Sequence, residues 1–114
     1  MANAELLSDE IKTFNDLAAA DLTAGEIILI NGHVCIAYAA LTSGDEGAFV
    51  YQGDMIEAPM EALAINAPAV AYWDDTAKVF TTDATGNTKC GVFTENRAGS
   101  ESTAVLELDN SINL

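Results

Sequence analysis

The chain has 114 residues, half of them hydrophobic, and its 18 acidic against 4 basic residues give a formal net charge of −14. One globular domain is expected at this length. Nucleic acid and anionic membrane are excluded as favoured partners, because phosphate binding rests on Lys and Arg. No apolar run reaches the roughly 20 residues of a membrane span, and the start MANAELLSDE lacks the pattern of a secretory signal.

Residues 1–23 differ from the rest and are predicted to form an N-terminal arm or helix, followed by a β-domain over residues 24–114. Ser8 is a suitable N-cap. Helical spacing that ends near Asp21 is shown by Ile11, Phe14, Leu17 and Ala18. Because an isolated helix of this length is marginal in water, the segment is expected either to pack on the domain or to become ordered on a partner.

From Gly25 onward the apolar pattern changes to that of strands. Asn31-Gly32 between two apolar segments is a strong hairpin signal. Gln52-Gly53-Asp54 predicts a turn. In this half of the chain, strands are expected at residues 27–30, 33–40, 48–51 and 55–57.

The second half begins with a predicted short helix over Met60–Ile65, since Pro59 suits a first helical position and Pro68 would end it. Short strands at regular spacing follow, separated by turn residues, a pattern typical of a small barrel or sandwich. The expected fold is mainly β: a small antiparallel β-barrel or sandwich with one short helix and an N-terminal arm or helix. The strands of this half are expected at residues 70–73, 78–82, 89–95 and 103–108.

The segment after the Asn-Gly turn is apolar on both of its faces. Val34, Ile36 and Tyr38 share one face of the expected strand, and the intervening residues on the other face are also apolar. This hairpin is therefore expected either to be central in the sheet or to take part in a subunit contact.

The chain contains no recognisable catalytic constellation. His33 is the single histidine, and no nucleophile motif accompanies it. Asp74-Asp75 and Asp83 could in principle serve acid–base chemistry or bind calcium, but their spacing lacks the alternating pattern of a calcium loop. Turn capping is the favoured interpretation, so no catalytic residue, metal site or cofactor is predicted.

Cys35 and Cys90 each lie in an apolar segment without a second cysteine or histidine nearby in the sequence. They are expected to act as small hydrophobic residues. A disulfide between them is not favoured, because a protein made in a reducing cytoplasm rarely keeps one.

Several segments, taken in order, resemble the small decoration (cement) proteins of tailed-phage capsids. The most similar are Tyr72-Trp73-Asp74, Thr81-Thr82 and the run from Gly86 to Val92. The resemblance extends over Ala24 to Leu108. It is absent from residues 1–23, and Pro68-Ala69 stands where the family usually has Gly-Asp before the Tyr-Trp strand.

The resemblance implies a β-tulip-like fold and a non-enzymatic virion protein made in the host cytoplasm. Such a protein would bind the outer surface of an assembled head and stabilise it by bridging major capsid proteins. It would associate with itself, as a homotrimer or a dimer, and would bind neither nucleic acid nor membrane. A tail or fibre component and a small ligand-binding β-barrel are the alternatives.

Two sets of residues are predicted to matter most. Trp73 and Asp74 are expected to form a structural corner between two strands. Apolar residues of the N-terminal segment need a surface to cover them, and deletion of residues 1–20 is expected to weaken binding. The predicted capsid or subunit contacts are Leu6, Leu7, Ile11, Phe14 and Leu17.

Overall fold

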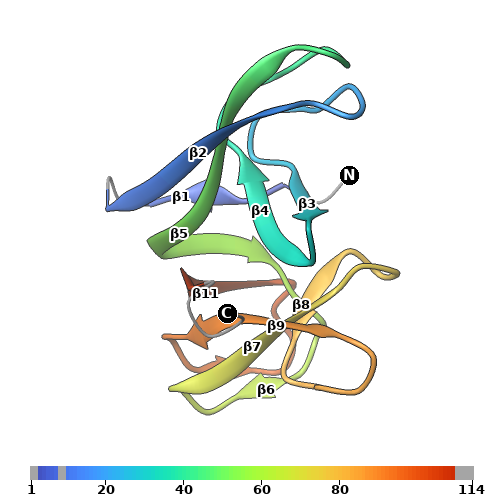
Figure 1. Ribbon diagram of the computed structural model, residues 1–114. Helices are drawn as coiled ribbons and strands as arrows, with labels where there is room; N and C mark the ends of the chain where they lie inside the picture. The colour runs from blue at the N-terminus through green and yellow to red at the C-terminus, as the bar shows by residue number, and fades with distance from the viewer. Residues whose placement is uncertain (1–2, 8–9, 110–114) are drawn as a thin grey trace.

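The computed structural model describes residues 3–7 and 10–109, and the regular structure in these ranges is entirely β (Figure 1). The strands are β1 (Glu5–Leu6), β2 (Ile11–Leu17), β3 (Ile27–Ile30), β4 (His33–Ala37), β5 (Glu46–Pro59), β6 (Ala64–Ile65), β7 (Ala69–Asp74), β8 (Val79–Thr81), β9 (Thr88–Phe93), β10 (Arg97–Ala98) and β11 (Thr103–Asp109). The predicted mainly β class is confirmed.

Nine of the strands form one curled sheet that resembles half of a barrel. Its order is β3-β4-β5-β11-β9-β7-β8, and both β1 and β2 pair with β5. β6 and β10 form a separate two-stranded sheet. In Figure 1, β2, β3 and β4 make an upper group of strands, and β7, β8, β9 and β11 make a lower group.

β5 is the strand that joins the two groups. Its first part pairs with β2 and β4, and its second part pairs with β11 and β1. The register shifts opposite β2 and again opposite β11, and such bulges bend a strand. The predicted turn over residues 52–54 is wrong, because Gly53 stays in the ladder and pairs with both Ile11 and Leu108.

The helix predicted in the N-terminal segment is also wrong, although its proposed cap, Ser8, lies outside the described residues. β2 pairs along the first part of β5 instead. Ile11 packs against one core cluster, whereas Phe14 packs against a second cluster on the other face of the sheet. The three-residue spacing that resembled a helix therefore comes from an irregular strand that packs on two faces.

The short helix predicted over Met60–Ile65 is absent as well. Met60 forms a parallel bridge with Phe80 of β8, and the N–H of Glu61 donates to the carbonyl of Phe80 at 2.8 Å. Ala64–Ile65 is a strand, β6, which pairs with β10. The segment follows the edge of β8, and these sheet hydrogen bonds replace those of a helix.

The β3–β4 hairpin forms as the Asn-Gly signal predicts. Asn31 and Gly32 have φ values of 52° and 81°, which suit a two-residue turn of type I′, and Ile30 pairs with His33 across it. β4 lies between β3 and β5 and is buried on both faces. Of the two predicted positions for this hairpin, the central one is therefore observed for β4.

Two apolar clusters occupy opposite faces of the sheet. The first fills the curl of the sheet and includes Trp73, Phe80 and Phe93, all fully buried. The second covers the other face of β4 and the first part of β5. Its buried members are Ala18, Leu22, Cys35, Ala37 and Phe49.

Candidate functional site

The side chains that the sequence suggested for catalysis make hydrogen bonds within turns. His33 starts β4, and its Nδ1 lies 3.1 Å from the carbonyl oxygen of Asn31. Among the residues that the structure describes, no group of three or more His, Cys, Asp or Glu side chains could hold a metal ion, and no helix is long and apolar enough to cross a membrane. Within the described ranges, no hydrogen bond joins the His33 ring to a carboxylate.

The carboxylates after Trp73 are bound within their own turn. Asp74 Oδ1 accepts hydrogen bonds from the N–H groups of Thr76 and Ala77, each at 3.0 Å. Asp75 Oδ1 accepts from Lys78 Nζ at 2.8 Å and from Trp73 Nε1 at 3.0 Å. The hydrogen bond from Lys78, followed by that from Trp73, holds the pKa of Asp75 below its usual value.

Trp73 lies at the inner side of this corner. The indole is fully buried and packs against Phe80 with ring centroids 4.8 Å apart. Its one polar atom is satisfied by Asp75, as a buried indole requires. The corner therefore connects the core to the β7–β8 turn through side-chain contacts.

A hollow beside β2 and β5 has a volume of about 330 Å³. Ligand sites usually combine an enclosed apolar wall with a few convergent polar groups. Surface side chains line this hollow instead, and it gives a ligand-binding function no support. They are Glu10, Ile11, Lys12, Gln52 and Asp54.

The five N-terminal residues predicted as contacts do not form one surface. Leu6 and Ile11 pack against the first core cluster, and Phe14 packs against the second. Leu7 and Leu17 remain open, with 42% and 63% of their surface exposed. Leu7 and Leu17 are therefore the exposed members of the five, and Leu6, Ile11 and Phe14 are half-buried.

Another set of apolar residues lies on the outer face of the lower part of the sheet. Side chains alternate between the two faces of a strand, and Leu6, Ile56 and Phe93 belong to the first cluster inside the curl. Leu7, Met55 and Val92, which adjoin them in the chain, therefore point outward, as does Val70, which pairs with Val92. We call this set the outer stripe: Leu7, Met55, Val92 and Val70.

The outer stripe crosses neighbouring strands. The N–H of Leu7 donates to the carbonyl of Met55 at 2.9 Å, and Val92 of β9 pairs with Val70 of β7. Glu107 of β11 pairs with Val92 on its other side. Glu107 also lies opposite the β5 bulge that contains Met55. Its neighbours Leu106 and Leu108 pair with Ile56 and Gly53, the β5 residues on either side of that bulge.

The sequence alone does not mark Met55, Val92 or Val70 as exposed residues. Met55 was assigned to a short strand after a turn, and the bulge that turns it outward depends on pairing with β11. Val70 stands between two alanines, so the inward and outward positions of this strand look alike in the sequence. Only the register of β7 against β9 distinguishes them.

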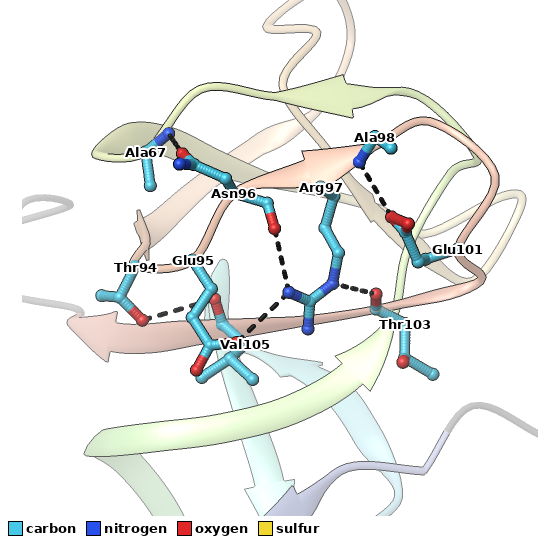
Figure 2. Close-up of polar contacts among 9 residues, drawn as sticks. All are labelled: Ala67, Thr94, Glu95, Asn96, Arg97, Ala98, Glu101, Thr103 and Val105. Atoms are coloured by element: carbon cyan, nitrogen blue, oxygen red, sulfur yellow. Dashed lines mark hydrogen bonds and ion pairs between the residues drawn. The ribbon is translucent and has the colours of Figure 1, made fainter.

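The loop between β9 and β11 is fixed by Arg97 (Figure 2). Its Nε donates to the carbonyl of Thr103 at 3.1 Å, and its Nη1 donates to the carbonyl of Asn96 at 3.0 Å and to Glu95 Oε1 at 3.2 Å. The Asn96 side chain accepts a hydrogen bond from the N–H of Ala67 at 2.7 Å. These contacts tie the small β6–β10 sheet to β11.

Cys35 and Cys90 are both buried and free. They lie in different clusters on opposite faces of the sheet. Burial raises the pKa of each thiol to about 12, with a smaller contribution from the Asp16 carboxylate at Cys35. Both thiols are therefore protonated at neutral pH and are poor nucleophiles.

The described part of the chain is thus a β-rich domain with a formed core, capped acidic turns and several exposed apolar residues. The family model described as phage cement protein matches residues 8–108, and the chain belongs to this family. Cement proteins are structural rather than enzymatic, and the family indicates a capsid-decorating role and a location on the phage capsid. No curated protein and no solved structure matches the chain.

Proposed function

We propose that the protein binds the outer surface of an assembled phage head and stabilises it by bridging neighbouring major capsid proteins. The observation that carries this proposal is the family match over residues 8–108. That range includes both groups of strands, so the likeness extends over the curled sheet except β1 and the last residue of β11. The capped carboxylates and protonated thiols are consistent with a role that needs binding surfaces and no chemistry.

Bridging requires at least two contacts, and a homotrimer or a dimer supplies them by repeating one surface. Several weak contacts held together bind much more tightly than one, through effective concentration. Leu7 and Leu17 are the N-terminal residues that we assign to contact with the capsid or with another subunit, since both are large, apolar and exposed.

The composition supports an outer location. A net charge of −14 favours solubility and would not attract packaged nucleic acid. Two free, buried cysteines suit a protein that folds in the reducing cytoplasm of a host cell. Both features agree with synthesis in the host and addition to the outside of a completed head.

The test uses heads of the phage that encodes this chain, produced without its gene. Purified protein is added, unbound protein is removed by sedimentation, and the heads are heated while DNA release is followed by dye fluorescence. We expect saturable binding and release at a higher temperature. Intact heads that neither bind the protein nor gain stability would refute the proposal, as would binding confined to broken heads.

Electron microscopy of the decorated particle distinguishes the proposed function from the main alternative, a tail or fibre component. Density on the head lattice is expected. Density on the tail or a fibre alone would assign the chain to another structural component of the virion.

A further inference from the structure

The outer stripe is an exposed apolar surface on a strongly acidic protein. Leu7, Met55 and Val70 expose 42%, 49% and 42% of their surface. Half of the large apolar side chains that are most exposed in the described chain thus lie on this stripe. Single exposed apolar residues are ordinary, whereas several gathered on one face of a sheet mark an interaction surface. Here Leu7 and Met55 lie on one side of Glu107, and Val92 and Val70 lie on the other.

Met55 adopts a backbone conformation that is unfavourable for its residue type. Its φ is 49°, in the left-handed region that glycine prefers. It lies at the β5 bulge, where the register against β11 shifts. Bulges redirect side chains, and strained residues concentrate at functional positions. Here the strained residue is exposed, and its carbonyl accepts the hydrogen bond from the Leu7 N–H.

The charge beside the stripe is negative. Glu107 lies within it, between Val92 and Met55. Glu5 and Glu57 face each other across β1 and β5 and occupy the next outward positions. None of these three carboxylates has a side-chain hydrogen bond or an ion pair with a described residue. An exposed cation, Lys89 of β9, lies near the end of the stripe that reaches β7, where it pairs with Tyr72.

Two like charges directly opposite in a sheet destabilise it modestly. Glu5 and Glu57 therefore bring no benefit to the isolated fold, and a partner with positive charge would remove their repulsion. Together with the unpaired Glu107, they define the chemistry of the surface that fits here.

We propose that the outer stripe is the docking surface for a capsid protein whose facing patch is apolar and bears Lys or Arg opposite Glu107, within the patch, and opposite Glu5 and Glu57, at its edge. This inference rests on the proposed function and specifies which face of the protein binds. The apolar side chains on either side of Glu107 provide the buried area of the contact, and the three carboxylates select a partner with basic residues facing them.

The same charges argue against a second copy of this chain on the stripe. A symmetric contact places the same patch on both partners. The three carboxylates of one stripe would then approach those of the other, and the nearby cation Lys89 would be outnumbered on each copy. Juxtaposed like charges are unfavourable in an interface, so the self-association that we propose must use another face.

The decisive variants are Met55→Gly, Val70→Ser and Glu107→Lys, tested for binding to heads made without the chain. Each is expected to weaken binding by about tenfold or more, the usual result for a residue central to an interface. Met55→Gly is especially informative, because glycine suits the local φ and the variant should remain folded. Wild-type binding should also weaken as sodium chloride is raised, because salt screens the three carboxylates from the basic residues that face them.

Matched controls alter exposed residues away from the stripe. Tyr38→Ser removes a side chain that is 54% exposed, and Glu46→Lys makes the same charge change at an exposed position that starts β5. Both should bind within about twofold of the wild type. Melting temperatures of all five variants show whether each is folded.

The outcomes separate this inference from the proposed function. If the wild type does not bind heads, the proposed function fails. If it binds, but the folded stripe variants bind equally well, the stripe is not the docking face. If these variants instead turn an oligomer into a monomer in analytical ultracentrifugation, the stripe is a contact between copies, and the inference is wrong.

Discussion

At the scale of single residues, Gly91 shows how closely β9 approaches β11. A Cβ atom built on this residue would lie 1.9 Å from the carbonyl oxygen of Glu107, so the two backbones would have to separate. Gly91→Ala is expected to lower the free energy of unfolding by about 2–3 kcal/mol, as overpacking does. Urea denaturation measures this loss.

The control is Gly47→Ala. Its added Cβ would meet only the end of the Leu41 side chain, which can rotate away. We expect a clearly smaller loss of stability than for Gly91→Ala. Equal losses would mean that strand separation is not the cause.

Asp75 gives a prediction for pH. Its pKa is lower in the folded protein than the usual 3.8, so its ionised form stabilises the fold above that value. This contribution disappears as the pH falls through the depressed folded-state pKa. Asp75→Asn should cost less than about 1 kcal/mol at pH 7, because the ion pair with Lys78 is half exposed.

Thermal unfolding of both proteins from pH 7 to pH 3 provides the measurement. The difference between them should be constant down to about pH 5 and should shrink below pH 4. A difference that grows on acidification would contradict the assigned direction of the pKa shift.

Residues whose structure depends on near neighbours were the ones that the sequence predicted well. Asn31-Gly32 forms its turn from local backbone preferences, and Asp74 caps the turn that follows it. Met55 was missed because its orientation depends on a register shift against β11, which lies about fifty residues later in the chain. Local patterns carry no information about such a shift.

At the scale of elements, β2 carries one aromatic side chain that packs in the core and one large apolar side chain that is exposed. The Phe14 ring lies near Phe49 and Tyr51, with centroids 5.9 and 6.0 Å away, whereas Leu17 is 63% exposed. Phe14→Ala should lower the free energy of unfolding by about 2–3 kcal/mol, toward the lower end for an aromatic ring because the site is half-buried.

Leu17→Ala is the matched control on the same strand. It should change stability by less than about 0.5 kcal/mol, as is usual for exposed positions. A similar loss for both variants would show that Leu17 packs within the fold. These two variants are also a better test of the N-terminal segment than deletion of residues 1–20. The deletion would remove β2 and uncover the second cluster, so it would also disturb the fold.

The two predicted helices failed for one physical reason. Helical spacing at residues 11–18 and proline placement at residue 59 are weak preferences, and pairing with an available strand outweighs them. β2 gains a ladder with β5, and Met60–Ile65 gains contacts with β8 and β10. Both partners are distant in sequence, so a single segment does not reveal them.

At the scale of the whole molecule, the two cysteines report on separate parts of the core. Neither should react readily with a thiol reagent at pH 8, since burial raises both pKa values to about 12. Cys35 should react faster than Cys90, because the smaller second cluster covers it and local opening there is easier.

Single Cys35→Ser and Cys90→Ser variants assign the two rates, and both thiols should react at once in strong denaturant. Equal slow rates in the folded protein would mean that both clusters open only when the whole chain unfolds. Rapid labelling of Cys90 would contradict its position in the first cluster.

The β class and the family could be predicted from the order of strand and turn signals, but the curled shape could not. Curvature arises where β5 changes register and exchanges partners. The candidate site was only partly predicted for the same reason. Leu7 was identified as an apolar residue in need of cover, whereas its neighbours on the outer stripe come from strands that only the curl brings together.

The continuity of β5 has a mechanical consequence. Because one uninterrupted strand belongs to both groups of strands, no flexible linker separates them, and a pull applied to one group reaches the other through covalent backbone. The ladders with β2 and β11 lie along that strand, so their hydrogen bonds would share a load along it instead of breaking one by one. A protein built in this way can resist stretching between two attachment points without an additional cross-link.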